Sequence, residues 1–231
     1  MNPGLQTAPG YVGSGALTEQ RHRVLRNTYW LLALSMVPTV LGAWIGVSTG
    51  LAAAMSPGVS MVVFLVGAFG LMFAVEKTKN SAAGVPVLLG FTFFMGLMLS
   101  RIIGTVLGLS NGASLIMMAF AGTGAIFLGM ASVSTVIKRD LSAMGKWLFI
   151  GAIMLLVAGI ANFFIQSSAL MITLMVMAIG IFSAFILYDL KRVQDGEETN
   201  YITATLGVYL SLYNVFQSLL ALLGIFGGDR E

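Results

Sequence analysis

The chain has 231 residues, of which 58% are hydrophobic and only 9% are charged. A soluble domain has about 25% charged residues, so this composition excludes an ordinary soluble protein and predicts a polytopic membrane protein. Because the chain contains no cysteine, a disulfide, a thiol nucleophile and a thiolate metal site are also excluded.

The first 26 residues differ from the rest of the chain. They begin MNPGLQTAPGYVGSGALTEQ, a polar stretch rich in Gly and Pro, with no short apolar core followed by a cleavage site. Such a composition is typical of a disordered tail rather than a signal peptide. We therefore predict a disordered cytoplasmic tail over residues 1–26 and a single seven-helix transmembrane domain over residues 27–231.

Seven apolar runs follow the tail, each close to the length of about 20 residues that a helix needs to cross a bilayer. Breaks such as SPG, EKTKN and KRD separate them. The pattern predicts an all-α integral membrane protein. The runs lie at 28–50, 58–75, 84–108, 113–137, 146–165, 169–189 and 201–226.

Lysine and arginine are concentrated on one side of this arrangement. Ten of the twelve lie in the tail or in the second, fourth and sixth connections, and only Arg101 and Arg230 lie elsewhere. Basic residues mark cytoplasmic loops, so we expect the N-terminus in the cytoplasm and the C-terminus outside. The basic charge balance is thus a topology signal, and we expect no nucleic-acid partner.

Ionisable groups inside the runs are few. Arg101 lies about 10 Å from the outer end of the third run at helical rise, where its side chain either snorkels to the headgroups or forms an ion pair or pore wall. Glu76 is expected to be a solvated interface charge. The only histidine, His22, has no neighbours to complete a metal site. We predict no metal, no cofactor and no catalytic residue, because the runs contain no nucleophile and base pair.

Asp189 ends the sixth run, in FILYDLKRV. It either pairs with Lys191 or Arg192, or faces a polar stripe on the last run. Ser211, Asn214 and Ser218 share one face there, at spacings of three and four residues. A turn centred near residue 196 brings Asp189 level with Thr203, and one centred near residue 200 brings it level with Ser211.

Three segments resemble the Bax-inhibitor family of seven-helix membrane proteins, most closely its bacterial YccA branch. They are LRNTYWLLALSM, GFTFFMGLMLS and the stretch from LYDLKRV through GEETNYITATLGVYLSLYNVFQSLLALLG. The resemblance covers essentially the whole chain and is most specific in the last segment. It implies a seventh helix surrounded by the other six and a cytoplasmic N-terminus.

The resemblance also implies a site. In family members that leak calcium, an aspartate ending the sixth helix shares a proton or hydrogen bond with a second aspartate in the seventh. Asp189 matches the first position, whereas Ser211 stands at the second and cannot titrate. For this chain the resemblance therefore implies a hydrogen-bonded latch of Asp189 and Ser211, with Asn214 nearby, and favours the deeper of the two turns.

Two functions follow from the resemblance. The YccA branch implies an inner-membrane protein that binds and modulates FtsH, the membrane-anchored ATP-dependent protease of membrane-protein quality control, and not an enzyme. The alternative is a cation or calcium leak, influenced by protons and gated around Asp189. Ser211 weakens this alternative.

Overall fold

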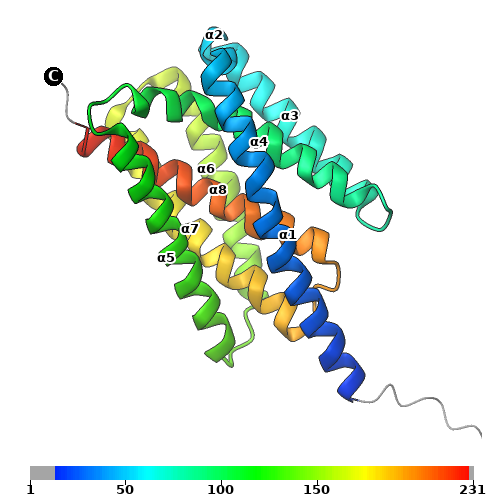
Figure 1. Ribbon diagram of the computed structural model, residues 1–231. Coiled ribbons are helices and arrows are strands. Elements are labelled where there is room, and N and C mark those ends of the chain that lie inside the picture. Colours follow the sequence, from blue (N-terminus) through cyan, green and yellow to red (C-terminus); the bar gives the residue numbers. More distant parts are fainter. Residues whose placement is uncertain (1–13, 229–231) are drawn as a thin grey trace, which may run out of the picture.

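The computed structural model describes residues 14–228, and this part of the chain is a bundle of helices (Figure 1). Seven helices are long and apolar enough to cross a membrane, so the predicted seven-helix fold is confirmed. The short α2 lies in the connection between the first two of these helices. The helices are α1 (Ser14–Thr49), α2 (Leu51–Ala54), α3 (Pro57–Thr78), α4 (Gly84–Leu107), α5 (Gly112–Val136), α6 (Ser142–Ile165), α7 (Ser168–Asp195) and α8 (Tyr201–Phe226).

Local sequence explains four of the helix ends. Ser56 and Ser167 cap α3 and α7 by accepting a hydrogen bond from a backbone N–H of the first turn. Gly196 ends α7 in the left-handed conformation, with φ of 83°, which glycine adopts without steric cost. Asn200 caps α8 by accepting from Ile202 N–H and Thr203 N–H.

Two boundaries differ from the sequence prediction. Residues 14–26, expected to belong to a disordered tail, form the first turns of α1, while residues 1–13 lie outside the described part. Val24 of this segment packs in a buried cluster with Val193 and Ala204, which stabilises the helix. Likewise α7 continues six residues past Asp189, to Asp195, because nothing breaks the helix before Gly196.

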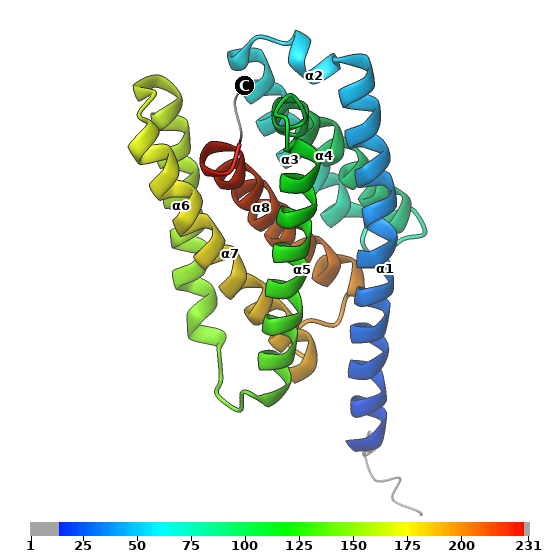
Figure 2. The same ribbon diagram turned by 60° about the vertical axis from the view of Figure 1, so that its left-hand side comes forward.

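The last helix, α8, lies at the centre of the bundle (Figure 2). It packs against α1, α3, α4, α5 and α7, and α6 makes its main contact with α7. Buried side chains of α8 form the core together with residues of α4 and α7, among them Phe91, Ile186 and Tyr209. The predicted central position of the last helix is therefore confirmed, with α6 on the outer side of α7.

Helices α1 and α4 make the most extensive contact between two helices of the described part, and glycines permit it. A Cβ added at Gly42 would meet the backbone of Phe93, and one added at Gly96 would meet the backbone of Thr39. A Cβ added at Gly46 would meet the side chain of Ser100. The Gly42 and Gly46 pair thus forms a close helix contact of the kind that small residues allow in membranes, whereas Gly104 of α4 has nothing within 4 Å.

Candidate functional site

Asp189 lies on the face of α7 that packs against α8. Its side chain is partly buried, and its carboxylate accepts no hydrogen bond from any residue of the described part. A Cβ added at Gly207 would lie 2.8 Å from Asp189 Oδ2 and 3.2 Å from its Cγ. The carboxylate is therefore in contact with the α8 backbone at Gly207.

Gly207 places Asp189 midway between the two predicted depths. It lies four residues after Thr203 and four residues before Ser211, which is about one helical turn from each. The connection from Gly196 to Asn200 centres the hairpin near residue 198, the mean of 189 and 207. The α8 residue level with Asp189 is thus Gly207, one turn after Thr203 and one turn before Ser211.

The polar stripe of α8 does not bond to Asp189. Ser211 Oγ donates to Gly207 O at 3.1 Å, and Asn214 Nδ2 donates to Leu210 O at 2.8 Å. Both groups are satisfied by carbonyls one turn earlier on their own helix. The hydrogen-bonded latch of Asp189 and Ser211 that the family resemblance implied is accordingly not found within residues 14–228.

Thr203 is the unexpected member of this face. Its hydroxyl oxygen is the one buried side-chain nitrogen or oxygen in the described part without a hydrogen-bond partner. Thr203 and Gly207 are four residues apart and share a helix face. The Asp189 carboxylate thus accepts no hydrogen bond from the described residues. The α8 face that it contacts at Gly207 also carries the Thr203 hydroxyl, which has no hydrogen-bond partner there.

Two charged groups act on the Asp189 carboxylate, Arg192 and Glu198. Arg192 also lies 3.7 Å from a carboxylate oxygen of Glu197 and 3.9 Å from one of Glu198, so its charge is shared among several acids. The alternative prediction was an ion pair of Asp189 with Lys191 or Arg192, and neither pair is found within residues 14–228. Lys191 instead donates to Asp195 at 2.7 Å, and the ion pairs of Arg192 are with Glu197 and Glu198. A partly buried carboxylate in this position can take up a proton or a cation.

The contact between Asp189 and Gly207 makes a testable prediction. Replacing Gly207 with alanine places a methyl group against the carboxylate, and we expect a cost of about 1–3 kcal/mol, as for other overpacked contacts. Removing the carboxylate by Asp189→Ala should relieve most of this cost in the double variant. Thermal unfolding of the four proteins in detergent measures the coupling. Additive effects of the two substitutions would contradict the contact.

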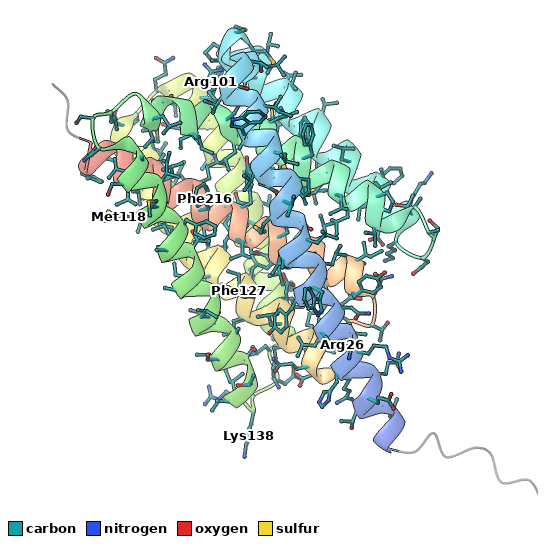
Figure 3. The ribbon with its side chains drawn as sticks, viewed as in Figure 1. Arg26, Arg101, Met118, Phe127, Lys138 and Phe216 are labelled. Atoms are coloured by element: carbon teal, nitrogen blue, oxygen red, sulfur yellow. The ribbon has the colours of Figure 1, made fainter. Side chains whose placement is uncertain are left out.

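Arg101 lies at the end of the molecule opposite Lys138 and Arg26 (Figure 3). Its Nη1 donates to Met55 O at 3.2 Å and, at the longer distance of 3.5 Å, to Ala52 O. No ion pair to Arg101 is found within residues 14–228. The side chain therefore binds the connection between α1 and α3, and it also lines a cavity described below.

The other end of the bundle carries most of the basic residues, and we call it the basic end. It comprises the start of α1 and the connections α3–α4, α5–α6 and α7–α8. Exposed Lys138 and Arg139 directly precede Asp140 there. Hydrogen bonds from the Ser142 hydroxyl and backbone N–H hold the pKa of the Asp140 carboxyl below its usual value. Asp140 therefore stays ionised and moderates the positive charge locally.

A family model described as "Inhibitor of apoptosis-promoting Bax1" (Bax1-I) matches residues 21–228, which cover the seven long helices from residue 21 of α1 onward. The chain belongs to this Bax-inhibitor family. The resemblance found in the sequence is confirmed.

Bacterial relatives match over nearly their whole length. A protein of Escherichia coli K12 named "Modulator of FtsH protease YccA" is 37% identical over 208 residues, which are 90% of this chain and 92% of that protein. An uncharacterized protein of Pseudomonas aeruginosa is 38% identical over 221 residues, 95% and 97% of the two chains. An uncharacterized membrane protein of Vibrio cholerae is 35% identical over 212 residues, 92% and 93%. The chain is a multi-pass protein of the bacterial inner membrane.

Gly207 and Thr203 are the residues of this site whose role the sequence prediction missed. Gly207 lies one turn before the polar stripe, in TATLGVYLS, and a glycine inside a helix that faces another helix signals close approach. Thr203 was considered only as the shallow alternative for Asp189.

Proposed function

We propose that the protein binds FtsH in the inner membrane and modulates its proteolysis of other membrane proteins. The observation that carries this proposal is the near full-length similarity to the Escherichia coli relative, whose name states that role. The family description names an inhibitor and that relative's name a modulator, and both support a regulatory role rather than an enzymatic one.

The basic end is the surface that we propose contacts the protease. Its arginines and lysines are placed in the cytoplasm by the positive-inside rule, on the side where an ATP-dependent protease must act. Exposed lysines lie at or near the α3–α4 and α5–α6 connections, namely Lys77, Lys138 and Lys146. A fixed array of positive charge suits recognition of an acidic surface.

Co-purification tests the proposal. The full-length protein, tagged after residue 231, is isolated from its native membrane in mild detergent and probed for FtsH. We expect the protease to be retained, and a double variant Lys138→Glu, Arg139→Glu to retain less of it. The double variant Gln166→Glu, Ser168→Glu, at exposed positions at the connection between α6 and α7 at the opposite end, adds negative charge away from the basic end and should retain FtsH as the wild type does. Absence of FtsH from preparations of folded wild-type protein would overturn the proposal.

The proposed orientation makes a separate prediction. A reporter that works only in the cytoplasm should be active when fused after residue 79 or residue 140, because both positions follow basic connections. It should be inactive when fused after residue 231. A cytoplasmic reporter that works at residue 231 would contradict the orientation with the C-terminus outside.

A cation leak around Asp189 is the second candidate function. The observation that favours it is the Asp189 carboxylate, which contacts Gly207 and has no fixed donor in the described part. Against it stands Ser211, which binds its own helix and cannot replace a second carboxylate. In liposomes this candidate predicts a calcium flux that depends on pH in the parent and is independent of pH in Asp189→Asn. Equal pH profiles of parent and variant would exclude it.

A further inference from the structure

A cavity of about 650 Å³ opens between α3, α4, α6, α7 and α8. Its volume lies within the range of about 300–1,000 Å³ that is common for small-molecule sites. Most of its wall is apolar, and flexible methionine side chains adapt to irregular ligands. The methionines in the wall are Met61, Met98, Met171 and Met175.

Five polar side chains interrupt this apolar wall: Ser60, Arg101, Thr105, Tyr213 and Gln217. The Tyr213 hydroxyl and the Gln217 amide make no hydrogen bond to any residue between 14 and 228. An apolar cavity with a few unused polar groups is the usual form of a binding site. These groups also indicate which part of a ligand is polar.

Arg101 supplies the charge. A guanidinium has five N–H donors, and only its Nη1 has partners here, the carbonyls of Ala52 and Met55. These carbonyls are dipoles and do not neutralise the positive charge, and no acidic side chain of the described part forms an ion pair with it. A charge within a membrane span is costly unless it is paired, so Arg101 favours an anion.

We propose that this cavity binds one anionic phospholipid, with the phosphate at Arg101 and part of an acyl chain among the methionines. Arg101 lies six residues before the end of α4 at Leu107, or about 9 Å along the helix, which is near the level of the headgroups. The leaflet at that end supplies such a lipid directly. A free phosphate ion would also pair with the Arg101 charge, but it has no apolar part to contact the methionines of the wall, so the cavity as a whole favours the lipid.

Lipid retention by the purified full-length protein tests this assignment. The protein is delipidated in detergent and titrated with phosphatidylglycerol, phosphatidylethanolamine or inorganic phosphate, and bound lipid is counted by native mass spectrometry. We expect one phosphatidylglycerol to bind in preference to phosphatidylethanolamine. We also expect inorganic phosphate not to displace it.

Two variants address the polar and apolar parts separately. Arg101→Gln removes the charge and should weaken phosphatidylglycerol binding by about tenfold or more, as expected for loss of a charge-assisted hydrogen bond. Ala221→Phe fills the cavity from α8 and leaves Arg101 intact, and it should also weaken phosphatidylglycerol binding. This variant tests the location of the lipid even if Arg101→Gln does not fold. Val157→Phe, on the exposed surface of α6 away from the cavity, is the control and should bind as the parent does.

Three results would overturn the proposal. Equal retention of both lipids would remove Arg101 as the headgroup ligand, and unchanged binding in Ala221→Phe would place the lipid elsewhere on the surface. The chain also has its own acids, Asp229 and Glu231, shortly after Gly224 in the cavity wall. If the full chain binds no lipid and a variant lacking residues 229–231 does, the chain's own C-terminus occupies the site.

Discussion

Gly96→Ala is expected to lower the thermal stability of the protein strongly, although it adds only one methyl group. The new Cβ would meet the backbone of Thr39, lying 2.8 Å from its carbonyl carbon and 3.0 Å from its Cα. Backbone atoms cannot rotate away as a side chain does, so α1 and α4 must separate. Overpacking usually costs about 1–3 kcal/mol, and we expect about 3 kcal/mol or more here, because the whole contact between the two helices is lost.

Gly104→Ala provides the matched control on the same helix. Gly104 has nothing within 4 Å of an added Cβ, and alanine is the better helix former by about 1 kcal/mol. Size-exclusion chromatography in detergent after heating measures the folded fraction of each variant. Equal thermal stability of the two variants would show that α1 and α4 do not pack as closely as described.

Tyr209→Ala is expected to have the next largest effect. Tyr209 is 1% exposed, and its ring packs edge-on against Phe91 with centroids 6.0 Å apart. Its hydroxyl lies 2.9 Å from Thr39 Oγ1 on α1 and 3.3 Å from Thr92 O on α4. Because Thr39 donates its own proton to Ser35 O, the Tyr209 hydroxyl donates to one of these two acceptors at a time. Loss of a buried aromatic ring typically costs about 3–5 kcal/mol, and thermal unfolding in detergent measures this cost.

Tyr209→Phe separates the ring from the hydroxyl. It keeps the packing and removes one hydrogen-bonding group, so we expect a loss of only about 1 kcal/mol. Thr39 retains its own bond to Ser35 O at 2.8 Å and is not left unpaired. If the phenylalanine variant is as unstable as the alanine variant, the hydroxyl network rather than the ring holds these helices together.

Hydropathy predicted the membrane spans well because the bilayer itself sets the length of an apolar run. It could not predict where helices continue into water. The first turns of α1 and the last turns of α7 are polar, and neighbours such as Val193 and Ala204 stabilise them after folding. Helix ends outside the bilayer therefore depend on tertiary contacts that hydropathy does not report.

The depth of Asp189 shows a second limit. Two turns differing by four residues fit the sequence equally well, and the structure adopts one between them, with Asp189 against Gly207. The family resemblance favoured Ser211 as the partner, yet the Ser211 hydroxyl is satisfied by Gly207 O. A hydroxyl in a membrane helix has a ready acceptor one turn earlier, so a polar stripe alone does not identify a partner on another helix.

Arg101 was predicted to snorkel, to form an ion pair or to line a pore. Its bonds to the carbonyls of Ala52 and Met55 were not among these alternatives, because they depend on how the connection containing α2 folds back over α4. Its place in the cavity wall likewise depends on five helices at once. The partners of Arg101 therefore depend on the assembled bundle. The sequence alone predicted only that a charged side chain lies in a membrane-spanning helix.

Modulation of FtsH by this protein, as proposed above, is measured most directly by the rate of proteolysis. FtsH and a membrane-protein substrate are reconstituted in liposomes at fixed amounts, with this protein or with an unrelated seven-helix protein at the same density. Degradation of the substrate should slow as the amount of this protein rises and stay constant with the unrelated one. An unchanged rate at all amounts of the folded protein would contradict the proposed function.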